Sequence, residues 1–339
     1  MSLPTLLGLL LGLSLTAYAT LAGADFGAGI LDLLAGDRAA DREAIAATIG
    51  PVWEANHVWL IFSITILFAA FPAAFSALGT ALLGPLTIAL LAVVLRGVAL
   101  GLRATADPGT RARVALSRMF GAASLSAPFV FGAVAGGLAA ASSAPAGEGG
   151  RLAARAAVHI PWAGAFGLLT GALAAVLCTQ LASSFVALGL ARAGDRGKAE
   201  WFRLRGLQAG ALTLVLSLAA PALAAAAAPR AWHGLLDHAL PILIVGLGAC
   251  AAFLYALWRR RYGLARAAGL LTGAALLWGW FAAQYPHLVG PRLTLDNTAA
   301  THAALAAVAV AAGAVLLLVL PAMYLLFAVS ARPELEVSE

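Results

Sequence analysis

The chain has 339 residues, of which 62% are hydrophobic and only 11% are charged. Soluble domains carry roughly 25% charged residues, so this composition excludes an ordinary soluble protein. It indicates an integral membrane protein that crosses the bilayer as helices, because a helix satisfies its backbone polar groups internally. The net charge of +6 does not indicate a nucleic-acid surface, because the basic residues are scattered over short loops.

The first apolar run covers residues 3–34 and contains one acid, Asp25, within the glycine-rich segment 23–29. No basic segment precedes this run, and it is longer than the apolar core of a signal peptide, so we expect a membrane helix. Further runs also reach the ~20 residues that span a bilayer. The nine expected spans are 3–34, 52–78, 80–102, 118–141, 161–191, 203–228, 238–258, 264–285 and 301–329.

Lysine and arginine residues predict the orientation of these spans. If the N-terminus lies outside, 16 of the 21 basic residues fall in cytoplasmic segments and 4 fall in outer segments. This asymmetry follows the positive-inside rule, so we expect the N-terminus outside and the C-terminus in the cytoplasm. The remaining basic residue, Arg96, lies inside the third expected span.

Two acids and Arg96 fall at a similar depth, in the cytoplasmic third of the membrane. Asp25 lies 22 residues after Leu3, about 33 Å along a helix that starts outside. Glu54 lies at the inner end of the second span, and Arg96 lies seven residues before Arg103, about 10 Å from the inner end of the third. Two compatible interpretations are open: a static ion pair that locks three helices together, and a carboxyl group that takes up and releases protons.

A histidine and an amide follow Glu54 in the sequence. Glu54 and His57 are three residues apart and would share a helix face, and with Asn56 they could support a chain of water. Taken alone, His57 is more typical of an interfacial histidine that faces lipid headgroups. No histidine lies in the middle of a span, so we predict no haem or metal ligand from this chain in the membrane centre, while ligation near the outer face stays open by position. His57 lies inside, and the outer histidines are His159, His233, His238, His287 and His302.

Several motifs resemble subunit II of the cytochrome bd-type quinol oxidases. They are dense over residues 20–105 and return at 278–297, whereas the middle of the chain agrees mainly in helix layout. The residues that carry the resemblance are Ala24-Asp25-Phe26-Gly27-Ala28-Gly29, Gly50-Pro51-Val52-Trp53-Glu54-Ala55-Asn56-His57-Val58-Trp59, Phe68-Ala69-Ala70-Phe71-Pro72, Leu95-Arg96-Gly97, Trp278-Gly279-Trp280-Phe281 and Leu293-Thr294-Leu295.

The resemblance implies an all-α fold of two four-helix bundles plus one peripheral helix. Within a single membrane domain over 1–330, the bundles would cover about 1–141 and 161–285, the ninth helix 301–329, and a polar tail 331–339. The resemblance also implies a homologous partner, subunit I, which carries two haems b and a haem d (or b in its place). A small single-helix accessory subunit is a further expected partner, beside membrane lipids and quinone, with no nucleic acid.

In that family the complex oxidises quinol, reduces dioxygen to water, takes its protons from the cytoplasm and lies in the bacterial inner membrane. Asp25, Glu54 and Arg96 would occupy positions linked to proton supply or assembly, with His57 and Asn56 beside them. The chain departs from the family where Glu54 replaces an aspartate and where Gly97 replaces a proline. The region around Phe120 has no acid, which puts a proton route through the fourth span in doubt.

Two other functions fit an apolar chain with intramembrane acids. A secondary transporter would place its ionisable residues near the midplane at a repeat interface, whereas the acids here lie in the inner third and no repeated pair of broken helices is evident. A purely structural scaffold for subunit I differs from the oxidase reading only in whether the proton path runs through this chain.

Overall fold

Almost all of the described chain is helical, as expected for a protein whose backbone must satisfy its polar groups away from water. The computed structural model describes residues 1–36, 38, 42, 45, 56–107, 109–143 and 160–330, with side chains as far as residue 325. The elements are α1 (Leu3–Ala35), α3 (His57–Ala70), α4 (Pro72–Ala81), α5 (Leu83–Thr105), α6 (Arg111–Ser142), α8 (Ala165–Arg192), α9 (Arg196–Ala227), α10 (Pro229–Gly234), a π-helical turn η1 (Leu235–Ala239), α11 (Leu240–Trp258), α12 (Tyr262–Gln284), β1 (His287–Val289), β2 (Leu293–Thr294), α13 (Leu295–Thr298) and α14 (His302–Ser330).

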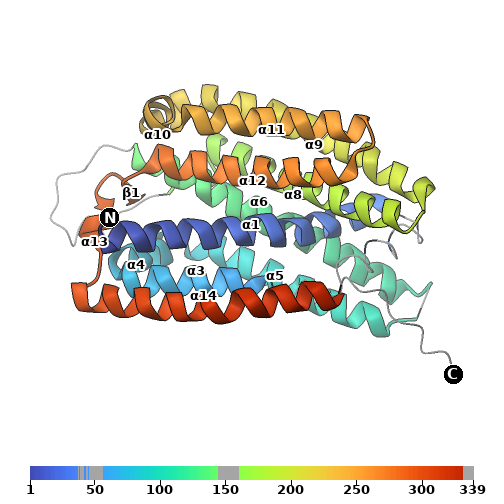
Figure 1. The fold of residues 1–339 in the computed structure, drawn as a ribbon, viewed down its shortest axis with the longest axis horizontal. Coiled ribbons are helices and arrows are strands. Elements are labelled where there is room, and N and C mark those ends of the chain that lie inside the picture. Colours follow the sequence, from blue (N-terminus) through green and yellow to red (C-terminus); the bar gives the residue numbers. More distant parts are fainter. Residues whose placement is uncertain are drawn as a thin grey trace.

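The long helices run side by side along the longest axis of the molecule (Figure 1). Eight of them, within the described residues, are long and apolar enough to cross a membrane, counting the continuous segment Pro229–Trp258 as one. This finding confirms the expected multi-pass membrane protein. Helices α3 and α4 supply a ninth crossing only if they are taken together as one broken span.

The expectation of one continuous helix over 52–78 is wrong, because the helix breaks at Phe71. Helices α3 and α4 meet there at an angle of 116°. Pro72 has no backbone N–H and its ring disfavours a helical conformation of the preceding residue, so Phe71 adopts φ −130° and ψ 58°. The next break falls at Leu82, between α4 and α5, whereas the expected spans 52–78 and 80–102 place it at residue 79.

Helix α1 lies at the centre of the packing. It contacts α3, α6, α8, α12 and α14. Helices α5 and α6 pack together on one side, and α8, α9, α11 and α12 pack on the other. Helix α14 lies along the edge of the molecule, against α1 and α3 (Figure 1).

Glycine residues allow α1 to approach α8 closely. A Cβ atom on Gly27 would overlap the backbone carbonyl group of Cys178, which is itself buried and free. Small residues at a helix crossing let two backbones approach, and such contacts drive helix association in membranes. The glycine-rich segment around Asp25 is therefore a packing surface as well as the setting of a buried acid.

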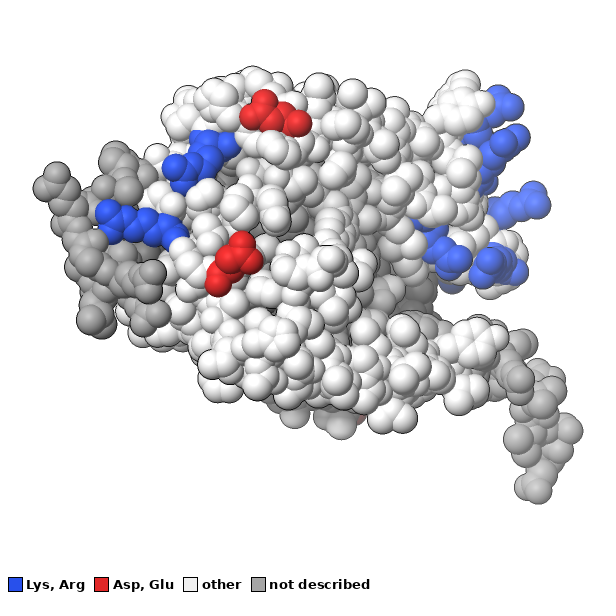
Figure 2. Space-filling view, turned by 60° about the vertical axis from the view of Figure 1, so that its left-hand side comes forward, with Lys and Arg blue, Asp and Glu red and all other residues white. Residues whose placement is uncertain are grey.

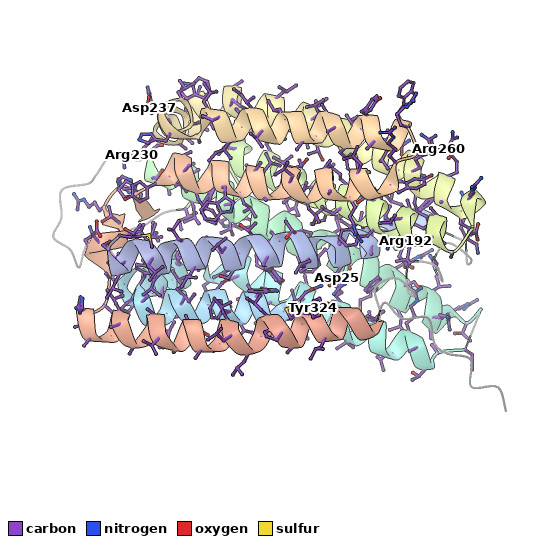
Figure 3. All side chains as sticks on the ribbon, viewed as in Figure 1. Asp25, Arg192, Arg230, Asp237, Arg260 and Tyr324 are labelled. Atoms are coloured by element: carbon purple, nitrogen blue, oxygen red, sulfur yellow. The ribbon has the colours of Figure 1, made fainter. Side chains whose placement is uncertain are left out.

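The two ends of the molecule differ in charge. In Figure 2, Lys and Arg side chains gather at the end opposite the N-terminus, whereas the other end carries both signs. Arg192 and Arg260 lie at this basic end, and Arg230 lies at the other end with the β1–β2 hairpin (Figures 1 and 3). This distribution agrees with the positive-inside rule if the basic end faces the cytoplasm. The orientation itself stays a prediction.

Candidate functional site

Asp25 is buried in α1, where only 4% of its surface is exposed. It lies nearer to the basic end of the molecule than to the N-terminal end (Figure 3). The side-chain amide of Asn56 donates a hydrogen bond of 2.6 Å to Asp25 Oδ2. Asn56 is itself buried and directly precedes the first residue of α3, so this bond joins α1 to the start of α3.

Arg96 on α5 is the largest fully buried side chain among the described residues and is 1% exposed. Its guanidinium carbon lies 5.1 Å from the centre of the Phe26 ring and 5.3 Å from the centre of the Phe120 ring. Such contacts with ring faces offset part of the cost of burying the cation. Its Nε donates a 3.2 Å hydrogen bond to Ser124 Oγ on α6, and its positive charge acts on Asp25.

The structure therefore brings together three of the predicted site residues: Asp25, Asn56 and Arg96. It also places His57 beside them. The His57 ring packs edge to face on the Tyr18 ring of α1, with centroids 6.1 Å apart. Because Tyr18 is buried, His57 belongs to the edge of this cluster and is not simply an interfacial side chain.

Unsatisfied polar atoms surround the cluster. Tyr18 Oη, Asn56 Oδ1 and Trp59 Nε1 are buried and have no hydrogen-bond partner within the part of the chain that the structure describes. Buried polar atoms are nearly always paired, and ordered water supplies the partner where protein does not. The surroundings of Asp25 are thus suited to hold water next to a carboxyl group.

Glu54, the other acid expected at this site, lies outside the described residues, as do Trp53 and His159. The tail 331–339 also lies outside them. The proposed role of Glu54 in proton transfer and its contacts with Asp25, Arg96 and His57 accordingly stay predictions.

Asp32 is a buried acid that sequence reasoning missed. It lies on α1 seven residues after Asp25, is 1% exposed, and accepts a 2.9 Å hydrogen bond from Arg103 Nη1. Arg103 lies seven residues after Arg96 on α5 and was counted only as a basic residue of a cytoplasmic segment. The repeated spacing of two helical turns on both helices is the signal that could have found this pair.

The end of the molecule that carries the β1–β2 hairpin has a separate polar cluster. His287 on β1 lies 3.5 Å from Arg230, measured from Nε2 to Nη1. Burial lowers the pKa of His287, and the positive charge of Arg230 lowers it further. The lowered pKa favours the neutral imidazole of His287 beside the Arg230 guanidinium.

Two cavities among the described helices contain no cluster of charged side chains. One cavity of about 150 Å³ lies among α6, α8, α9, α11 and α12. The other, of about 370 Å³, lies between α1, α3, α12 and the segment that follows α12, and Gln284 and His287 are among its few polar lining residues. No group of three His, Cys, Asp or Glu side chains in the described ranges is placed to hold a metal ion.

Comparison with known proteins decides the family. The family model for cytochrome bd terminal oxidase subunit II matches residues 3–330. The chain belongs to the cytochrome bd terminal oxidase subunit II family. This result confirms the resemblance that the motifs around Asp25 and Arg96 indicated.

Two relatives of known name match the subunit II chain over shorter stretches. The cytochrome bd ubiquinol oxidase subunit 2 of Bacillus subtilis (strain 168) is 36% identical over 106 residues, which is 31% of each chain. The cytochrome bd-I ubiquinol oxidase subunit 2 of Escherichia coli (strain K12) is 38% identical over 69 residues, or 20% of this chain and 18% of the relative. Each match thus covers less than a third of the relative's length.

A solved structure has the same fold over the whole subunit II chain. It is the bd oxidase from Geobacillus thermodenitrificans, with a TM-score of 0.76 over 98% of this chain and 99% of that one. Sequence identity is 23%, so this likeness concerns the fold alone.

Proposed function

We propose that this chain is a working subunit of a terminal oxidase complex that oxidises quinol and reduces dioxygen to water. The observation that carries the proposal is the match of the subunit II family model to residues 3–330. The electron transfer and the oxygen chemistry would be supplied by two haems b and a haem d (or b in its place), all held by a homologous subunit I. We expect no haem ligand from this chain, because no histidine lies in the middle of an expected span and the resemblance assigns the haems to subunit I.

The specific role that we propose for this chain is proton uptake from the cytoplasm. Reduction of dioxygen consumes protons, and these must reach the haem-bearing subunit from inner water. Asp25 is a buried carboxyl group at the inner side whose hydrogen-bond donor is the neutral amide of Asn56. A carboxyl group that accepts a hydrogen bond from a neutral donor can bind and release a proton more readily than one in a bidentate ion pair with arginine.

Glu54 would be the second acid of this path, with Arg96 compensating the charge of both carboxylates. The proposal for Glu54 is supported by the sequence, in which it precedes by two residues the amide that binds Asp25. His57 and Asn56 would hold water between the two acids. Burying Arg96 without a compensating acid would be costly, so the same group also stabilises the packing of α1, α5 and α6.

The architecture that we propose has nine spans, with the bent pair α3–α4 as the second. One four-helix bundle would cover about 1–141, a second 161–285, and α14 would be peripheral at 301–329, all within one membrane domain over 1–330. The N-terminus would lie outside and the C-terminus inside a bacterial cytoplasmic membrane. The chain would stabilise subunit I, and a small single-helix subunit would complete the complex in contact with lipid and quinone.

A secondary transporter is the second candidate, and the break between α3 and α4 is the observation that favours it. Transporters use broken helices to build substrate sites. Here, however, the charged cluster lies at the start of α3, about 21 Å along the helix from the break at Phe71. A broken helix without polar residues at its break is a poor substrate site, so we favour the oxidase subunit.

Purification of the tagged chain from its own membrane tests the proposal. The oxidase predicts that a larger, haem-bearing subunit is purified with it and that the preparation consumes oxygen when quinol is added. The transporter predicts a haem-free chain that drives solute uptake coupled to a proton gradient in vesicles, and that result would overturn the proposal.

A further inference from the structure

The inner ends of α1 and α5 carry a second acid and a second arginine at matching positions. Asp32 follows Asp25 by seven residues, and Arg103 follows Arg96 by seven residues. Seven residues are two helical turns, so each pair shares one face of its helix. The ion pair of Asp32 with Arg103 therefore lies about 10 Å nearer to the inner surface than Asp25 and Arg96.

Only one carboxylate oxygen of Asp32 is satisfied. Arg103 Nη1 binds Oδ1 at 2.9 Å, and the charge of Arg42 also acts on this carboxyl group. Oδ2 is buried and has no hydrogen-bond partner within the described ranges. The Asp32 side chain is 1% exposed, whereas that of Arg103 is 11% exposed, so the pair connects a buried acid to the edge of the protein.

The surface pair of Glu200 and Arg203 provides the contrast. Arg203 binds both oxygens of Glu200, and Arg260 lies 3.5 Å from one of them. Arginine frequently binds both oxygens of a carboxylate in this way. The open oxygen of Asp32 is therefore available to a proton or to a water molecule.

The hydroxyl group of Ser124 lies between the two acids of α1. A Cβ atom on Gly29 would overlap Ser124 Oγ, so the hydroxyl is seated directly on α1 at this glycine. Gly29 is four residues from Asp25 and three from Asp32, or about 6 Å and 4.5 Å along the axis. The hydroxyl accepts the hydrogen bond from Arg96 Nε and keeps its own proton to donate.

We propose that Asp32 is the inner acceptor of a proton relay that loads Asp25 through the Ser124 hydroxyl. The proposal rests on the proposed proton uptake through this chain and names its entry. Asp32 Oδ2 takes a proton from inner water and passes it to Ser124 Oγ, directly or through one bridging water. Ser124 gives its own hydroxyl proton to the Asp25 carboxylate in the same direction.

After the transfer Asp25 is neutral and Asp32 is again a carboxylate paired with Arg103. One proton has moved along α1 from the level of Asp32 to Asp25, away from the inner surface. The serine regains its starting orientation by rotating its hydroxyl group. The positive charges of Arg103 and Arg42 stabilise the Asp32 carboxylate until it takes the next proton. The hydrogen bond from Arg96 fixes the position of Ser124.

The test uses the purified complex and measures quinol-dependent oxygen consumption, normalised to haem, from acidic to alkaline pH. Asp32→Asn should lower turnover by about tenfold or more at alkaline pH, with partial recovery at acidic pH, because proton supply becomes limiting. Ser124→Ala should slow turnover in the same way, and Asp32→Glu should retain most of it. Glu200→Gln, which breaks a partly exposed ion pair outside the proposed relay, is the matched control and should leave the pH profile unchanged.

The variant Asp25→Asn distinguishes failure of the relay through Asp32 from failure of the proposed proton path as a whole. Slow turnover in Asp25→Asn with full turnover in Asp32→Asn overturns the relay through Asp32 and keeps the path through Asp25. Full turnover in both overturns the proton path itself.

If Asp32→Asn alone fails to assemble, a double variant that removes the charges of Asp32 and Arg103 keeps the inference testable. Asp32→Asn combined with Arg103→Gln removes the acid together with its hydrogen-bonded arginine, so Arg103 is not left without its partner. Slow, pH-dependent turnover of that assembled double variant supports the relay, and full turnover overturns it.

Discussion

The Asn56 amide donates a 2.6 Å hydrogen bond to Asp25 Oδ2, so the start of α3 is held against the C-terminal half of α1. This contact joins two segments that are 31 residues apart in the sequence. Asn56, which follows Glu54 by two residues in the sequence, thereby contacts the buried acid of α1. Asp25 is thereby the part of the candidate site on which the other groups converge.

Glu54→Gln should assemble with its haems and reduce oxygen more slowly. Glutamine keeps the size and the hydrogen-bonding capacity of Glu54 but cannot release a proton, and loss of a proton-transfer group commonly costs about 10²-fold or more. Glu54→Asp should retain much of the activity because it keeps the carboxyl group. Steady-state oxygen consumption per haem decides between these expectations, and equal rates in the native protein and Glu54→Gln would return Glu54 to a structural role.

Arg96→Leu should reduce the amount of assembled complex rather than slow turnover of the complex that forms. Removing one partner from a buried charge cluster typically costs about 3–5 kcal/mol, because the remaining carboxylate is left uncompensated. Haem content per membrane protein measures assembly. Arg260→Gln is the control, since that arginine is 65% exposed, and an assembly defect of the same size in both variants would contradict the prediction.

Gly27→Ala should destabilise the complex through helix packing alone. Its new Cβ atom would overlap the carbonyl group of Cys178, and overpacking of this kind costs about 1–3 kcal/mol or more when the neighbour is backbone. We expect a lower midpoint of thermal unfolding, measured by loss of the intact complex on size-exclusion chromatography. Gly101→Ala adds the same methyl group where nothing lies within 4 Å and should leave the midpoint unchanged.

The membrane helices could be predicted from the sequence because apolar runs of ~20 residues have few alternatives in a bilayer. The second expected span shows the limit of that reasoning. Hydropathy treats residues 52–78 as one run, but Pro72 removes a hydrogen bond and restricts Phe71, so the helix turns there by 116°. The proline was visible in the sequence and carried the information that hydropathy lacks.

The candidate site was predictable only in part. Depth along the helices correctly brought Asp25 and Arg96 together, since both lie near the same end of the membrane. It did not predict that Asn56 binds Asp25, because the start of α3 relative to α1 depends on tertiary packing. Asp32 was missed because an acid near a helix end looks exposed in the sequence, whereas in the fold it is 1% exposed.

The C-terminus should lie in the cytoplasm and the N-terminus outside. The prediction rests on the gathering of basic side chains at one end of the molecule, which Figure 2 shows. Reporter proteins fused after Ser330 test it, because one class is active only in the cytoplasm and another only outside. Activity of the outer-compartment reporter alone would contradict the proposed topology.

Turnover of Asp25→Asn tests the central claim, proton uptake through this chain, most directly. Asparagine preserves the shape of the side chain and removes the titratable carboxyl group in contact with Asn56. We predict a complex with full haem content whose oxygen consumption per haem falls by about tenfold or more at neutral pH. Full oxygen consumption in Asp25→Asn, with an unchanged pH profile, would contradict the account.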